Sequence, residues 1–111
     1  MATERRMRIV DPRGGEAGDD QRVCLVARVE GRVQGVGYRA FVVMRAAALD
    51  LTGWVRNGPP GVVDLEAEGT RPALEHLLRD LNEGPPASRV REVHSEWAPV
   101  RGYRGFDVKR T

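Results

Sequence analysis

Apolar residues recur at helical spacing in two segments of the chain. In the second segment four leucines follow the i, i+3, i+4, i+7 pattern of a helix with one buried face: Leu74, Leu77, Leu78 and Leu81. We expect this helix to begin after Thr70 as its N-cap, with Pro72 in the first turn. The run Gly84-Pro85-Pro86 predicts its end.

The first helix is expected over residues 40–51. Its apolar positions recur with a period close to 3.6 and are interpreted as one core-facing stripe: Ala40, Phe41, Met44, Ala47, Ala48 and Leu51. Met44 is accordingly predicted to fill space in the core.

Five further segments have the patterns of strands. The run 23–29 is apolar on both faces, which favours a central strand. Residues 62–68 alternate, with Val63, Leu65 and Ala67 on one face and Glu66 and Glu68 on a face expected to be solvated. Shorter or less regular strands are expected over three other ranges: 52–57, 88–97 and 103–110.

The element order is β-α-β-β-α-β with one further strand, which predicts an α+β, ferredoxin-like two-layer sandwich. We expect an antiparallel sheet with two helices on one face and an extra C-terminal edge strand. This domain is placed at residues 23–111. Residues 1–22 mix opposite charges with glycine and have almost no apolar periodicity, so they are expected to be a flexible extension. A short edge strand around Ile9 and Val10 is the less favoured alternative.

Composition restricts the class of protein. At 111 residues, with a net charge of +2 and one cysteine, the chain is expected to be one cytoplasmic domain that is a monomer. No apolar run approaches the length of a membrane span, and no histidine or cysteine cluster has metal-ligand spacing. We therefore predict no cofactor, no metal, no membrane partner and no nucleic-acid partner. Cys24 is expected to be a small buried residue.

The candidate chemistry lies between the first strand and the first helix. Residues 30–39 contain Gly31, Gly35 and Gly37, which permit a backbone that comes close to a ligand. Successive amides and a helix N-terminus favour an anion, and Arg39 adds a fixed cation. The loop has neither the Gly-Lys-Ser/Thr ending of a nucleotide P-loop nor the glycine spacing of a dinucleotide fold. These residues alone indicate an anion-binding loop with an arginine.

Three motifs extend this interpretation. Gly31-Arg32-Val33-Gln34-Gly35-Val36-Gly37-Tyr38-Arg39 and Gly53-Trp54-Val55-Arg56-Asn57 closely resemble the two signature motifs of acylphosphatases, and Gly102 to Val108 resembles that family's last strand. The resemblance covers roughly residues 23–110. It implies metal-independent hydrolysis of acyl phosphates to carboxylate and inorganic phosphate.

The resemblance also implies roles for individual residues. Arg39 matches the family's catalytic arginine, and Asn57 matches its water-orienting asparagine. The amides of the segment from Arg32 to Val36 match its phosphate-binding loop, namely Arg32, Val33, Gln34, Gly35 and Val36. Arg56 is expected to point away from Asn57.

The topology and the chemistry support these roles. In a split β-α-β unit the first two strands are parallel, so the loop and Asn57 should lie at one end of the sheet. An anion site, an arginine and a neutral amide can hold a phosphoryl group and orient a water for in-line attack. Asn57 is a poor proton acceptor, so the reaction needs a good leaving group such as a carboxylate, with a pKa of roughly 4 to 5.

Two alternatives compete with this function. One is a binding module that holds an acyl or carbamoyl phosphate without turnover, as acylphosphatase-like domains also occur within larger carbamoyl-transfer proteins. The other is single-stranded nucleic-acid binding, which the same topology serves when aromatic residues are exposed on the central strands. The segments 23–27 and 63–67 contain no aromatic residue, so this second alternative is ranked lower.

Overall fold

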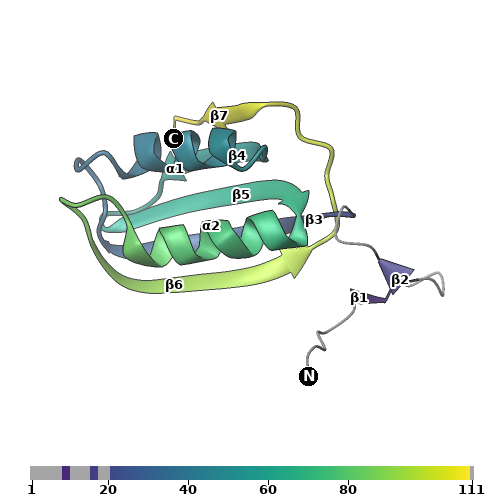
Figure 1. The fold of residues 1–111 in the computed structure, drawn as a ribbon. Coiled ribbons are helices and arrows are strands. Elements are labelled where there is room, and N and C mark those ends of the chain that lie inside the picture. Colours follow the sequence, from purple (N-terminus) through teal and green to yellow (C-terminus); the bar gives the residue numbers. More distant parts are fainter. Residues whose placement is uncertain (1–8, 11–15, 18–20, 111) are drawn as a thin grey trace, which may run out of the picture.

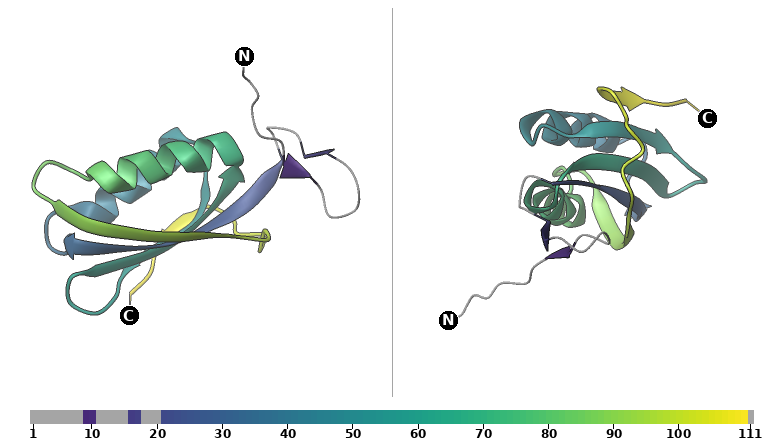
Figure 2. Two further views of the ribbon diagram at one scale, coloured as in Figure 1. Left: turned by 90° about the horizontal axis from the view of Figure 1, so that it is seen from below. Right: turned by 90° about the vertical axis from the view of Figure 1, so that its right-hand side faces the viewer.

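The computed structural model describes residues 9–10, 16–17 and 21–110, and two helices cover one face of its main sheet (Figure 1). The elements of the main sheet and its two helices are β3 (Arg22–Arg32), α1 (Tyr38–Ala48), β4 (Thr52–Asn57), β5 (Val62–Thr70), α2 (Arg71–Glu83), β6 (Arg89–Ala98) and β7 (Phe106–Val108). This confirms the predicted α+β, ferredoxin-like sandwich with both helices on one side (Figure 2).

The strand order is β6-β3-β5-β4-β7. The pairs among β6, β3, β5 and β4 are antiparallel, as predicted, whereas the edge strand β7 runs parallel to β4. The sheet is therefore mixed. The reason is the connection after β6, which crosses to the far edge of the sheet and arrives at the end where β4 begins, so β7 must run in the direction of β4 (Figure 1).

The core lies between the helices and the sheet. Alternate residues of β3 and β5 are buried there, together with the leucines of α2: Leu25, Ala27, Val29, Val63, Leu65, Ala67, Leu74, Leu77 and Leu81. The buried leucines confirm the core-facing side of α2 that their spacing predicts. Thr70 is the N-cap of this helix, as predicted, and its side chain accepts a hydrogen bond of 3.4 Å from the Ala73 amide.

The predicted core-facing row of α1 is only partly right: Phe41 packs against the core and Leu51, just after the helix, is buried, but the alanines of that row are exposed. The buried residues of α1 are Tyr38, Val42 and Ala46, and Met44 is 55 % exposed instead of packed in the core. The helix begins at Tyr38, whose buried hydroxyl donates to the backbone oxygen of Leu81 at 2.7 Å. Because Tyr38 is fixed against α2, the row at i, i+4 and i+8 from it faces the core.

The expectation of a fully solvated outer face on β5 is also wrong. Glu68 is buried, and its carboxylate accepts hydrogen bonds from the backbone amides of Arg101, Gly102 and Tyr103. Glu66 accepts a hydrogen bond from the Tyr103 hydroxyl at 2.6 Å. The segment between β6 and β7 thus covers this end of the sheet face that the helices leave open.

The N-terminal region is described only in part. Ile9–Val10 (β1) and Glu16–Ala17 (β2) pair as a separate two-stranded antiparallel sheet, so the Ile9 segment is a strand but not an edge of the main sheet. Most of the expected flexible extension lies outside the described residues, and its flexibility stays a prediction. Among the described residues, no helix is long and apolar enough to cross a membrane.

Candidate functional site

The C-terminal ends of β3 and β4 lie at the same end of the sheet. Both strands are antiparallel to β5, which lies between them. Glu30 on β3 pairs with Val62, and Asn57 on β4 pairs with the neighbouring Val63. Helix α1 starts directly after the loop that leaves β3, so its N-terminus belongs to the same end (Figure 1).

The loop at residues 33–37 leaves its backbone amides available. Among the described residues, none of these amides has a hydrogen-bond acceptor. Gly35 and Gly37 have φ values of 73° and 81°, a left-handed conformation that glycine adopts without strain. A Cβ atom on either glycine would meet nothing within 4 Å, so the space beside them is open.

The first backbone amides of α1 are also without a capping side chain. Gly37 is its N-cap residue, no side chain caps it, and its first turn contains no acidic residue. The first amides of a helix have no intrahelical acceptor and carry a partial positive charge. Loop and helix together therefore present consecutive N–H donors suited to an anion.

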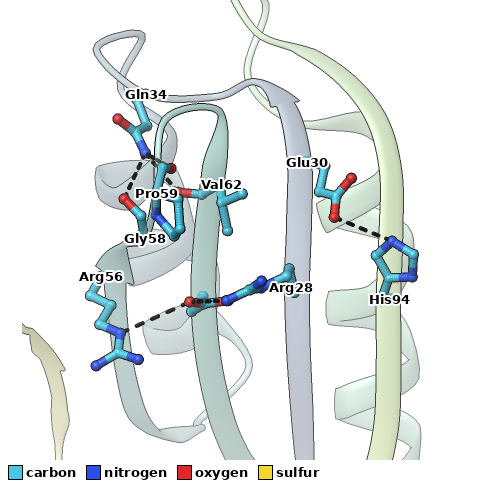
Figure 3. Close-up of polar contacts among 9 residues, drawn as sticks. Arg28, Glu30, Gln34, Arg56, Gly58, Pro59, Val62 and His94 are labelled. Carbon is cyan, nitrogen blue, oxygen red and sulfur yellow. Dashed lines mark hydrogen bonds and ion pairs between the residues drawn. The ribbon is translucent and has the colours of Figure 1, made fainter.

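Gln34 fastens this loop to the turn after Asn57 (Figure 3). Its side-chain amide nitrogen lies 2.7 Å from the Pro59 oxygen, 2.8 Å from the Val62 oxygen and 3.3 Å from the Gly58 oxygen. The Gly31 amide adds a hydrogen bond of 3.0 Å to the Gly61 oxygen. These contacts fix the loop relative to the end of β4. The sequence resemblance assigned the Gln34 amide to the phosphate-binding loop but gave no sign of these side-chain partners.

Asn57 is the last residue of β4. Strand alternation places it on the same face as the buried Val55, which is the face that the helices cover. Its side-chain oxygen Oδ1 is buried and has no hydrogen-bond partner within the described part of the chain. A buried acceptor without a partner costs free energy, on the order of 1–3 kcal/mol. In this structure the oxygen has neither a described protein partner nor contact with solvent.

Arg39 lies in the first turn of α1 and is partly buried. Four other arginines are within 3.3 Å of carboxylates: Arg28, Arg45, Arg71 and Arg91. Arg39 has no carboxylate partner within 4.0 Å among the described residues. Arg32 is an exposed residue at the last position of the β3–β6 ladder, opposite Arg89, and the role of its amide in phosphate binding stays a prediction.

Arg56 points away from Asn57, as expected. It lies on the open face, where its guanidinium carbon is 5.1 Å from the centre of the Trp54 ring. Its Nε lies 4.0 Å from the Asp64 carboxylate, an ion pair drawn as a dashed line in Figure 3. Arg28 donates two hydrogen bonds, of 2.8 and 3.1 Å, to the same carboxylate. Hydrogen bonding to Asp64 raises the pKa of Arg28 above its usual value. These residues line a shallow groove of about 410 Å³ on the face opposite the helices, away from the loop.

The family model and the related sequences agree on the family of this chain. The acylphosphatase family model matches residues 25–108. A protein of Salinibacter ruber named acylphosphatase is 49% identical over 96 residues, which cover 86% of this chain and 99% of that protein. These shares exclude a match confined to the loop motif.

Solved structures agree with the sequence comparison. An acylphosphatase from Coxiella burnetii has a TM-score of 0.77 and 41% identity, covering 79% of this chain and 93% of that chain. Full-length HypF in its phosphate- and nucleotide-bound form has a TM-score of 0.75 and 32% identity. That match covers 81% of this chain but only 12% of HypF, so the same fold also occurs as a small part of a larger protein.

Proposed function

Because this chain belongs to the acylphosphatase family, whose reaction is acyl phosphate hydrolysis, we propose that the loop at residues 32–36 and Arg39 hold the phosphoryl group while Asn57 orients the attacking water. The acyl phosphate is the small-molecule substrate, and carboxylate and inorganic phosphate are the products. No metal ion takes part in this scheme.

The observation that carries the proposal is the set of loop amides without acceptors, which Gln34 ties to the end of the strand that carries Asn57. The Asn57 carboxamide can accept a hydrogen bond from a water or donate one to it. The hydrogen bonds from the Gln34 side chain hold the end of β4 at a fixed position relative to the loop. A water held by Asn57 and a phosphoryl group held by the loop would then keep a fixed relative position, which is what in-line attack requires.

The donors of the loop act on the charge that the reaction develops. The phosphoryl oxygens share negative charge in the transition state, and preorganised N–H groups and a guanidinium stabilise it without reorganisation. Arg39 supplies the positive charge, and its planar guanidinium can donate to two phosphoryl oxygens at once. In enzymes that stabilise an oxyanion, removal of one such donor costs on the order of 10²–10³ in kcat.

The reaction balances without a general acid in the protein. The water oxygen forms a bond to phosphorus, and the bond between phosphorus and the acyl oxygen breaks. The carboxylate leaves with the electron pair, and the water's proton passes to the phosphate product or to solvent. The conjugate acid of this leaving group has a pKa of roughly 4 to 5, so the leaving group does not need a proton at neutral pH.

The test is phosphate release from a simple acyl phosphate with a chelator present. We expect wild type to turn over, Arg39→Gln to lose about 10²-fold or more in kcat/KM, and Arg79→Gln to match wild type. Arg79 is a suitable control because it is an exposed arginine on α2, the other helix. In water enriched in oxygen-18, the label should enter phosphate and not the carboxylate.

Two results would contradict the proposal. If Arg39→Gln and Arg79→Gln lose the same small fraction of activity, Arg39 does not hold the phosphoryl group. If the oxygen-18 appears in the carboxylate, water attacks carbon and not phosphorus, and the role given to Asn57 fails.

A further inference from the structure

A second group of polar side chains lies on the outer face of β3 and β6, outside the loop and Asn57. Glu30 on β3 pairs directly with Glu92 on β6, and His94 lies two residues beyond Glu92 on the same face. Each can offer one ligand atom, and these three atoms lie within 4.8 Å of one another. Figure 3 shows the Glu30 carboxylate directed at the His94 ring.

The distances from His94 to the two carboxylates fit the coordination of a small transition-metal ion, and the two carboxylate oxygens lie within 4.8 Å of each other. His94 Nε2 lies 3.5 Å from Glu30 Oε2 and 3.6 Å from Glu92 Oε1. Zinc bonds to imidazole nitrogen and carboxylate oxygen are about 2.0–2.2 Å, so a tetrahedral ion separates its ligand atoms by roughly 3.3–3.6 Å. The His94 ring therefore already lies at coordination spacing from both carboxylates.

The negative charges of Glu30 and Glu92 are only partly compensated by the neighbouring cations. Glu30 and Glu92 are like charges directly opposite each other on neighbouring strands, a pairing that destabilises a sheet. Arg91 Nη2 lies 3.3 Å from Glu30 Oε1 and leaves Oε2 toward His94. The other nearby cation, Arg28, is held by both oxygens of Asp64. A cation between the two carboxylates and the imidazole would relieve the repulsion between the glutamates.

We propose that Glu30, Glu92 and His94 form a binding site for a divalent transition-metal ion of the zinc type, completed by water. One imidazole nitrogen and two carboxylate oxygens suit zinc, cobalt or manganese better than magnesium, which prefers oxygen ligands alone. The ion joins β3 to β6 at the point where their register shifts between Glu30 and Gly31, directly before the phosphate loop. It takes no part in the hydrolysis.

The test is a calorimetric titration of the whole chain with Zn²⁺ in buffer free of chelators. We expect one Zn²⁺ per chain, with affinity about 10-fold or more weaker in His94→Gln and in Glu92→Gln. His76→Gln is the matched control, because the His76 side chain is 48% exposed against 52% for His94 and, within the described part of the chain, it has one carboxylate within 4.0 Å, that of Asp80 at 3.9 Å. All these side chains are at the surface, so the variants should keep the fold, which circular dichroism checks.

Nitrogen-15 spectra of the histidine rings identify the ligand atom. Zn²⁺ should shift His94 Nε2 and leave His76 unchanged. The proposal is overturned if wild type shows no saturable binding, if His94→Gln binds as wild type does, or if His76→Gln weakens binding as much as His94→Gln.

Discussion

The side-chain amide of Gln34 donates to the backbone oxygen of Pro59 at 2.7 Å, which ties the loop before α1 to the turn after Asn57. The Val62 oxygen lies at 2.8 Å from the same nitrogen. One side chain thus sets the distance between the amides proposed to hold phosphate and the residue proposed to hold water. The two parts of the proposed site follow β3 and β4, two strands that both pair with β5.

Gln34→Ala should therefore affect both stability and phosphate binding. Loss of these hydrogen bonds is expected to lower the free energy of unfolding by about 1–2 kcal/mol, measured by urea denaturation. Inorganic phosphate should bind more weakly to this variant, because the loop is no longer fixed. Asn82→Ala is the control, since Asn82 donates to the Leu78 oxygen at 2.8 Å on the surface of α2. If both variants bind phosphate equally well, Gln34 does not shape the loop.

Two glycines of the loop motif should respond differently to alanine. A Cβ on Gly31, where φ is +143°, would lie 2.2 Å from the Arg89 backbone oxygen, so Gly31→Ala should cost about 3 kcal/mol or more of stability. A Cβ on Gly35 meets nothing, so Gly35→Ala should cost only the roughly 1–2 kcal/mol of a left-handed conformation. Equal losses of stability in urea denaturation would show that the close approach at Gly31 is relaxed at little cost.

Glu68→Gln should destabilise the segment that covers the open face of the sheet. The Glu68 carboxylate accepts from the Gly102 and Tyr103 amides at 3.1 Å, and from the Arg101 amide. A neutral side chain that also carries N–H donors is a poorer acceptor, so we expect a loss of about 1.5–3 kcal/mol in urea denaturation. Glu75→Gln, which removes an exposed pair with Arg71, should cost less than about 0.5 kcal/mol. A loss in Glu68→Gln no larger than in Glu75→Gln would contradict this role.

Cys24 should make the fold sensitive to alkali. Burial, with the charges of Glu66 and Glu68, raises the pKa of its thiol from 9.0 to about 11. The unfolded chain therefore releases this proton first as the pH rises, so the thiol's contribution to stability is complete below pH 9 and is lost between pH 9 and about 11. The slope of unfolding free energy against pH in this window should be shallower in Cys24→Ala. Equal slopes in the two proteins would exclude the thiol as the cause.

The sequence predicted the architecture well where local patterns and tertiary packing agree. The leucines of α2 are separated from its polar residues, so their period alone identified the buried face. In α1 alanine, valine and methionine occur on all sides, and the face was decided instead by Tyr38, whose hydroxyl reaches α2. Such a contact between two helices cannot be recognised from the spacing of apolar residues in either helix.

Long-range contacts explain the other differences. Glu66 and Glu68 have the alternation of a solvated strand, yet residues 101–103 fold back over them and supply their hydrogen-bond donors. For the candidate site, the sequence predicted that Asn57 and the loop lie at one end of the sheet. It gave no indication of the partners of Gln34, since these depend on how the turn at residues 58–61 packs against the loop.

The most direct test of the central claim compares phosphate affinity with turnover in Asn57→Ala. If Asn57 orients water and the loop holds phosphate, kcat with a simple acyl phosphate should fall by about 10² or more while the Kd for inorganic phosphate stays within a factor of about two. Arg56→Ala, one residue earlier and facing the other way, should keep both. The account is contradicted if Asn57→Ala keeps its kcat, or if kcat and phosphate affinity fall together.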